Sequence, residues 1–265
     1  MSITRGDTVT GTWHKAVRSS WFTWSASVLL GAAVWELVGR LGPHDKLVFV
    51  PLSTVLRSLG TWFSKDHALS DLRTSAVEFG IGYGIALGVG LVVGVILGRS
   101  KFLNKVFGPI IYVFYTAPII TLSPVIIGII GLNLGAESFI IFAIAVFPVI
   151  FNTIAGIRNV PKDLKDVATA YDGPRLRRLL RVEGPGALIH IMVGARMAVS
   201  RALVGLYLAE LLGASDGVGF TAYTAYTNLD VPRLYAALLA LALAGMVITG
   251  LLRLIEVRIT HGVEL

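Results

Sequence analysis

The chain has 265 residues, of which 55% are hydrophobic and 15% are charged, and its mean hydropathy is +0.76. A soluble domain carries about 45–50% apolar and about 25% charged residues, so this composition argues against a soluble enzyme and for a protein of the lipid bilayer. We attribute the net charge of +7 to basic loops at one membrane face and not to nucleic-acid binding. The absence of cysteine excludes a disulfide framework and a thiolate metal site.

The N-terminal part of the chain is predicted to form a cytoplasmic tail over residues 1–20 and a first transmembrane helix over residues 21–39. A cleaved signal peptide is the alternative, because basic residues precede the apolar run. We favour an uncleaved span, since the run is longer than the about 7–15 apolar residues of a signal peptide. Residues 40–73 are predicted to be an interfacial or extracytoplasmic segment, with an amphipathic helix that follows Pro51 and is capped by Ser53.

Five further apolar runs are predicted to cross the membrane, which makes about six transmembrane helices in an all-α membrane protein. They lie in a core over residues 74–258, and a cytoplasmic tail over 259–265 follows. The predicted spans cover residues 75–98, 106–131, 138–157, 187–212 and 234–252.

Two features suggest how the predicted spans pack and what they line. In the span 75–98, glycines recur every four residues, and such a stripe allows close approach of a helix of the same chain or of a second copy. In the span 106–131, Pro118 and Pro124 are predicted to break the helix, either to line a pathway or as an architectural kink. Asn152 either lines a cavity or joins helices by a hydrogen bond. The glycine triplets are 80, 84 and 88, and 90, 94 and 98.

The orientation is predicted from lysine and arginine residues, which concentrate in alternate loops. The loop after the span 75–98, the loop 159–185 and the region after the last span, with Arg253 and Arg258, are basic, whereas the intervening loops at residues 133–137 and 213–232 have no basic residue. Cytoplasmic loops carry the excess of positive charge, so both termini and the loop 159–185 are predicted to be cytoplasmic. The segment 40–73, which mixes basic and acidic residues, is the exception to this alternation.

Enzymatic motifs are absent from the sequence. It contains no G-x-x-x-x-G-K-[ST] phosphate loop, no H-E-x-x-H and no G-x-S-x-G, and its five histidines have no metal-ligand spacing. We therefore predict no catalytic residue, no metal site and no cofactor in this chain. The charged residues inside predicted spans need partners, and Arg201 and Glu210 are predicted pathway residues. The alternative for the two cations of this span is that Arg196 reaches lipid phosphates, while Arg201 pairs with a carboxylate or with carbonyls.

The loop 159–185 is long and basic for a connection between two spans. Pro161 is predicted to begin a helix that places Leu164, Val167, Ala168 and Tyr171 on one face, and Asp172-Gly173-Pro174 ends it. An amphipathic helix of this kind docks into a groove on another protein or lies on anionic lipid, and the pattern alone does not decide between them.

The same loop resembles the cytoplasmic EAA loop of the inner-membrane permeases of ABC importers. The resemblance continues in "FVPLSTVLRSL", "FPVIFNTIAGIRNVPKDL" and "GARMAVSRALVGLYLAELLGASDGVGF", covers about residues 49–258, and is most similar to the nitrate/sulfonate/taurine branch. In the loop, Gly173 follows one position after the site of the motif glycine. The matched positions are Asp166-Val167-Ala168 for Glu-Ala-Ala, Asp172 for the glycine, and Gly184-Pro185 for the hydrophobic–proline pair.

This resemblance implies a type I ABC importer permease fold with a cytoplasmic coupling helix, in the inner membrane of a prokaryote. It implies a homodimer that forms the substrate pathway, two separate ATPase subunits that bind ATP and Mg²⁺, and an extracytoplasmic binding protein that delivers a small anion or another small nutrient. The residues implied to contact the ATPase are Asp166, Val167, Ala168, Ala170, Tyr171, Asp172 and Gly173.

Two other classes remain as alternatives. An ion-coupled secondary transporter would have an inverted repeat with broken helices at matching places, and only one broken span is predicted here. A purely structural membrane scaffold would have no need of a broken span or of arginines within spans.

Overall fold

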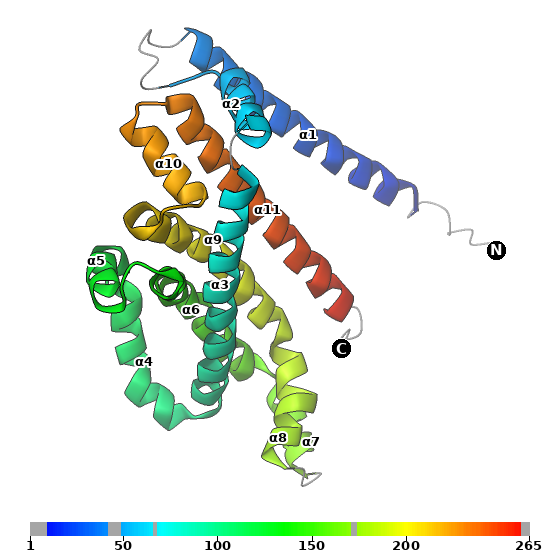
Figure 1. Ribbon diagram of the computed structural model, residues 1–265. Helices are drawn as coiled ribbons and strands as arrows, with labels where there is room; N and C mark the ends of the chain where they lie inside the picture. The colour runs from blue at the N-terminus through cyan, green and yellow to red at the C-terminus, as the bar shows by residue number, and fades with distance from the viewer. Residues whose placement is uncertain (1–9, 42–48, 66–67, 171–173, 261–265) are drawn as a thin grey trace, which may run out of the picture.

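The computed structural model is helical throughout the residues that it describes, which are 10–41, 49–65, 68–170 and 174–260 (Figure 1). One element, η1, is a single π-helical turn, and the others are α-helices. The elements are α1 Thr10–Leu41, α2 Leu52–Lys65, α3 Ala68–Arg99, α4 Lys101–Thr116, α5 Ile119–Ile130, α6 Leu134–Asn159, α7 Lys162–Ala170, α8 Arg175–Arg178, η1 Leu179–Glu183, α9 Gly184–Gly213, α10 Val218–Thr227 and α11 Val231–Thr260.

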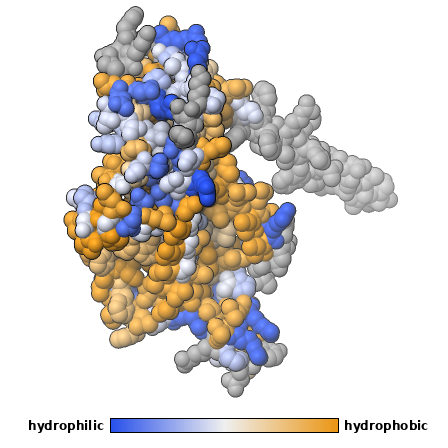
Figure 2. All heavy atoms as spheres, viewed as in Figure 1, coloured by the Kyte–Doolittle hydropathy of each residue, from blue (hydrophilic) through white to orange (hydrophobic). Residues whose placement is uncertain are grey.

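Four helical runs in the described part of the chain are long and apolar enough to cross a membrane: α3, α6, the run from α8 through α9, and α11. They confirm the predicted second, fourth, fifth and sixth spans. The predicted first span, 21–39, lies within α1, which begins inside the segment expected to be a tail; because several of its side chains are outside the described residues, its crossing stays a prediction. Figure 2 shows apolar residues in a broad band around the middle, with polar residues above and below.

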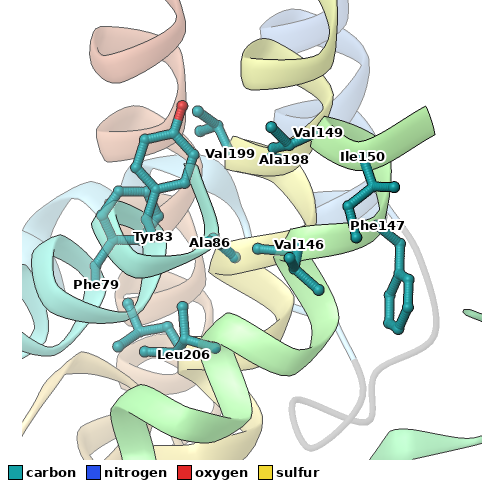
Figure 3. Close-up of a cluster of buried hydrophobic side chains, with 13 residues drawn as sticks. Phe79, Tyr83, Ala86, Val146, Phe147, Val149, Ile150, Ala198, Val199 and Leu206 are labelled. Atoms are coloured by element: carbon teal, nitrogen blue, oxygen red, sulfur yellow. The ribbon is translucent and has the colours of Figure 1, made fainter. Parts of the chain in front are cut away.

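The core of the molecule lies between α3, α6 and α9. α6 packs along both neighbours, and its Val146, Val149 and Ile150 meet side chains of α3 and α9 (Figure 3). The hydroxyl of Tyr83 in α3 donates a hydrogen bond of 3.0 Å to the carbonyl oxygen of Ala195 in α9, which satisfies this polar atom inside the apolar core.

Only one of the two predicted glycine triplets of α3 packs closely against another helix of this chain. Gly90, Gly94 and Gly98 face α6, and a Cβ on Gly94 would lie 2.5 Å from the Cβ of Thr153. Gly82 and the buried Ala86 extend this stripe at the same four-residue spacing. A Cβ added to the glycines of the other predicted triplet, residues 80, 84 and 88, would meet nothing within 4 Å. These glycines therefore do not face a described helix of this chain. Both triplets have the same spacing, so the pattern cannot say which one faces α6.

The predicted third span, 106–131, is not one straight helix. α4 and α5 meet at an angle of 90°. The break lies at Pro118, because Ala117 before it adopts an extended backbone (φ −61°, ψ 138°), as residues that precede proline prefer. Pro109 and Pro124 lie inside α4 and α5, so the prediction that Pro124 also breaks the helix is wrong.

α2 confirms the predicted amphipathic helix after Pro51 but not its predicted cap. The helix begins at Leu52, and the Pro51 carbonyl accepts hydrogen bonds from the amides of Thr54 and Val55. Ser53 is thus inside the helix, where its amide and hydroxyl donate to the Glu36 carboxylate at 2.9 and 2.8 Å. These bonds attach α2 to α1.

Candidate functional site

The predicted coupling helix is present as α7, a nine-residue helix between α6 and α8. Pro161 precedes it, and the Pro161 carbonyl accepts from the Lys165 amide at 3.3 Å. The Lys165 ammonium donates to the carbonyl oxygen of Ile157 at 2.9 Å, near the end of α6. The Arg178 guanidinium donates to the Thr169 hydroxyl at 2.7 Å. These hydrogen bonds attach α7 to the end of α6 and to α8, the helices before and after it.

The predicted ATPase-contacting residues lie on different sides of α7. Asp166, Val167 and Ala170 are exposed, and Val167 leaves 56% of its surface accessible. Ala168 is half-buried and lines a cavity against the body of the protein, so the expected apolar face is divided between the two sides of the helix. The remaining three predicted residues, Tyr171, Asp172 and Gly173, lie outside the described residues. The surface that α7 offers to a partner thus includes Asp166, Val167 and Ala170.

A π turn leads from this loop into α9. The Gly184 amide donates to the Leu179 carbonyl, five residues back, and Pro185 follows with no amide to donate. A Cβ on Gly184 would lie 2.9 Å from the Leu179 oxygen. In the observed conformation, the π turn therefore favours glycine at this position.

Glu210, predicted to line the pathway, lies at the opposite end of α9 and is 0% exposed in this chain. Its carboxylate accepts short hydrogen bonds from the Ser75 hydroxyl and from the Gly219 amide. The Ser75 hydroxyl in turn accepts from the Val218 amide at 2.9 Å. These bonds join α3, α9 and the start of α10, so the geometry gives Glu210 a positioning role; its place in a substrate pathway stays a prediction.

Asp71 also forms hydrogen bonds to the segment between α9 and α10 and to the start of α10, which Glu210 contacts as well. Its carboxylate accepts from the Trp62 indole at 3.1 Å and from the Thr221 hydroxyl at 2.9 Å. The Gly217 amide also donates to it at 3.4 Å. Gly217 has φ +117°, and a Cβ there would lie 2.6 Å from the Glu210 carboxyl carbon, so only glycine fits.

Glu78 and Glu137 complete this group of buried carboxyls. The Glu78 carboxyl faces those of Glu137 and Glu210, and its Oε2 has no hydrogen-bond partner among the described residues. Glu78 and Glu137 line a cavity of about 530 Å³ that Arg73 and Asp216 also border. We name Asp71, Ser75, Glu78, Glu137 and Glu210 the carboxylate network. No group of three or more histidine or acidic residues in the described part of the chain is arranged to hold a metal ion.

Sequence reasoning missed most of this network. Glu78 lies near the start of the predicted span 75–98, and a charged residue within a span needs a partner, which is the one signal that the sequence contains. Nothing in the sequence identified Ser75 or Asp71, because apart from Trp62 their partners lie about 135–150 positions later and include backbone amides, which no side-chain pattern reveals.

The two arginines of α9 differ from the expected alternative. Arg196, expected to reach lipid phosphates, forms a short ion pair with Glu256 of α11. Arg201, expected to pair with a carboxylate or with carbonyls, is exposed and makes no hydrogen bond or ion pair with any residue that the structure describes. The sequence could not place Glu256 opposite Arg196, because these residues are 60 positions apart.

Arg201 shares an open face of α9 with Met197 and Ser200, which are also exposed. The amide of Asn152 in α6 donates to the Pro148 carbonyl at 2.8 Å and lies 3.7 Å from the Met197 sulfur. The structure therefore brings Asn152 next to this face, one helical turn from Arg201.

Pro118 and Pro124 are also exposed, in a surface that is almost entirely apolar. α4 has no buried residue, and Phe114 and Ile129 are examples of the large apolar side chains that α4 and α5 expose. This surface needs lipid or another protein to cover it.

A bundle of long apolar helices with a broad apolar band around its middle, and with the short helix α7 beyond that band, defines a multi-pass membrane protein. Residues 86–261 match the family described as the binding-protein-dependent transport system inner membrane component, and the chain belongs to this family. It is thus the permease of an ABC importer, and a secondary transporter is not favoured.

Two relatives illustrate the branch. The chain is 27% identical over 238 residues to the Bacillus subtilis protein assigned as the aliphatic sulfonates transport permease SsuC, covering 89% of this chain and 86% of that protein. It is 30% identical over 158 residues to the nitrate import permease NrtB of Synechococcus elongatus, covering 60% and 57%. Both fit the predicted nitrate/sulfonate/taurine branch.

A solved structure confirms the predicted type I permease fold. The MetNI methionine ABC transporter in an inward facing conformation matches with a TM-score of 0.57 at 18% identity, covering 80% of this chain and 97% of that one.

Proposed function

We propose that two copies of this chain form the substrate pathway of an ATP-driven importer and that α7 couples each copy to a separate ATPase subunit. ATP and Mg²⁺ bind to the ATPase subunits, and a binding protein on the other side of the membrane delivers the substrate. Both termini and α7 lie in the cytoplasm of a prokaryotic cell. The observation that carries this proposal is the exposed face of α7 on a helix whose base is fixed to α6 and α8.

The coupling role requires that α7 be held rigidly against the membrane helices. A coupling element must move as a unit, so that a force on one side changes the arrangement on the other. Lys165 and Thr169 tie α7 to both flanking helices, while Val167 and Ala170 stay free for contact. A groove on the ATPase that receives these apolar side chains would therefore push the membrane helices and not α7 alone.

The test is co-purification of the ATPase subunit with the permease. We expect Val167→Asp to weaken association at least about ten-fold, since burying an unpaired charge in an interface costs more than about 1.4 kcal/mol. Leu69→Asp is the matched control, because Leu69 is also apolar and is 73% exposed, on α3. Equal association of both variants with the ATPase would contradict the assignment of this face.

The proposed second copy would cover the apolar surface of α4 and α5. The natural absence of cysteine allows a direct test with single-cysteine variants. We expect Ile129→Cys on α5 to cross-link between two copies in native membranes, since 81% of its surface is exposed. Met246→Cys on α11, 59% exposed, serves as the control. If Ile129→Cys did not cross-link more than Met246→Cys, this surface would be assigned to lipid.

The proposed substrate is a small anion such as a sulfonate, nitrate or bicarbonate, or another small nutrient. The support is the kind of substrate in the names of both relatives and the exposed cation Arg201 beside Asn152. A cation at a membrane pathway attracts an anion. We expect Arg201→Ala to raise the substrate concentration for half-maximal uptake about ten-fold while assembly persists, and Arg201→Lys to raise it less, because it keeps the charge. Unchanged uptake by Arg201→Ala would remove Arg201 from the pathway.

A further inference from the structure

We propose that the cavity between the α3–α4 corner and the segment around α7 binds a phosphate-bearing anion. The cavity has a volume of about 1180 Å³ and is bordered by four parts of the chain: the end of α3, the start of α4, the end of α6 with α7, and the run from α8 into η1. We call it the basic cavity. It shares Lys165 and Arg178 with the bonds that hold α7, but neither the coupling role of α7 nor the proposed pathway assigns a ligand to it.

The charge on its walls is almost wholly positive. Arg99, Lys101 and Lys105 border it from the α3–α4 corner. Arg158, Lys162, Lys165 and Arg178 border it from the other side. Among the described residues that line it, the single carboxylate is that of Glu183, which already pairs with Arg99 at 2.9 Å.

Several of these cations are held in place. Lys165 and Arg178 are fixed by their bonds to the Ile157 carbonyl and to the Thr169 hydroxyl. The Arg158 guanidinium donates at 3.4 Å to the Leu97 carbonyl. The Nε of Arg178 is buried and has no hydrogen-bond partner among the described residues. The donors that these lysine and arginine groups still present to the cavity are the kind that a phosphate oxygen accepts from.

The start of α4 adds a second source of positive potential. Ser100 caps this 16-residue helix, and Ser100 and Asn104 line the cavity. Its first turn contains no acidic residue that would neutralise the free amides. A helix N-terminus favours an anion, in addition to the side-chain charges around it.

A general excess of basic residues in the loops at one membrane face does not account for this arrangement. That excess explains how many lysines and arginines lie at one face, but it does not require them to converge on one cavity. Arg253 and Arg258, for example, are exposed on α11 and do not line it. Like charges around a shared cavity repel one another, so their convergence indicates a bound counter-anion.

The chemistry of the cations selects the class of ligand. Arginine forks and lysine ammonium groups together match the oxygens of a phosphate monoester or diester. Two sources can supply this group: the headgroup of an anionic phospholipid, or a free phosphate compound. Val95 and Ile96 form an apolar part of the wall, which suits the first carbon atoms of a lipid. The experiment must separate these sources.

The test titrates the purified full-length chain with three probes: short-chain phosphatidylglycerol, short-chain phosphatidylcholine and inorganic phosphate. The variant Lys101→Gln/Lys105→Gln/Lys162→Gln removes three exposed charges from the cavity, and its control Arg177→Gln/Arg253→Gln/Arg258→Gln removes three exposed charges that do not line it. We expect the cavity variant to lose affinity on the order of 100-fold, at roughly five-fold for each charge, and the control to lose little.

Each outcome decides the proposal. Saturable binding of phosphatidylglycerol alone, lost in the cavity variant, identifies a lipid headgroup as the ligand, and the same result with inorganic phosphate identifies a free phosphate. The proposal is overturned if neither probe binds, if phosphatidylcholine binds as tightly as phosphatidylglycerol, or if both triple variants lose affinity equally. Should the triple variant fail to fold, the single changes Lys101→Gln and Lys105→Gln carry the same expectation, with roughly five-fold losses each.

Discussion

The carboxylate network and the basic cavity treat charge in opposite ways. In the carboxylate network, Glu210 and Asp71 receive hydrogen bonds from side chains and amides of the same chain. In the basic cavity, seven cations share one carboxylate. The difference lies in how far the chain itself satisfies each region. Hydrogen bonds from the same chain hold Glu210 and Asp71 in a structural joint, although the Oε2 of Glu78 has no partner among the described residues, whereas the cavity leaves most of its charge for another molecule to neutralise.

The comparison predicts its largest effect at Glu210. We expect Glu210→Ala to lower the free energy of unfolding by about 4 kcal/mol, because two buried donors, on Ser75 and Gly219, each lose an acceptor at about 1–3 kcal/mol. Denaturant unfolding of the purified protein in detergent measures this change. Glu210→Gln, which keeps the shape and one acceptor oxygen, should lose less. A loss below about 1 kcal/mol for the alanine variant would mean that the network does not hold the structure.

A smaller loss is expected at Gly217, in the loop that the carboxylate network holds. Gly217→Ala combines a strained φ of +117° with a Cβ that would press on Glu210, so we expect a loss of about 2 kcal/mol. Gly84→Ala in α3 is the matched control, because its Cβ meets nothing within 4 Å and alanine favours a helix. The same unfolding measurement compares the two. Equal stability of both variants would show that the loop can move away from Glu210 at little cost.

The smallest effect is expected at the basic cavity. Arg99→Gln removes the ion pair with Glu183, whose side chains are 28% and 13% exposed, and partly exposed pairs contribute about 0–1 kcal/mol. We therefore expect less than about 1 kcal/mol of lost stability, with weak dependence on salt. A loss comparable to that of Glu210→Ala would place this ion pair among the structural joints and remove the contrast between the two regions.

The features that the sequence predicted well are local ones. α3, α6, α9 and α11 follow from apolar runs of the length that a bilayer requires, and α7 follows from Pro161 and an amphipathic pattern. The fold itself was reachable through motifs spread over most of the chain, which the family match confirms.

The features that could not be predicted from the sequence depend on which helices pack against each other. The glycine stripe that packs on α6 and the exposed one have identical spacing, so only the packing of α3 distinguishes them. The pairing of Arg196 with Glu256, and of Ser75 with Glu210, joins residues 60 and 135 positions apart. A break at Pro118 was predicted, but the angle of 90° between α4 and α5 and the contacts of α5 with α6 and α9 are tertiary features that no local pattern encodes.

The π turn at η1 has a mechanical consequence. From Gly184 to Gly213, α9 is a regular helix of 30 residues, about 45 Å long, that transmits twist without absorbing it. The single wide turn and Pro185, which has no amide to donate, interrupt the regular hydrogen-bond pattern of this run at one place. Because α9 is otherwise unbroken, Met197 and Arg201 keep a fixed orientation relative to Glu210, whose hydrogen bonds attach the far end of the helix to α3 and α10.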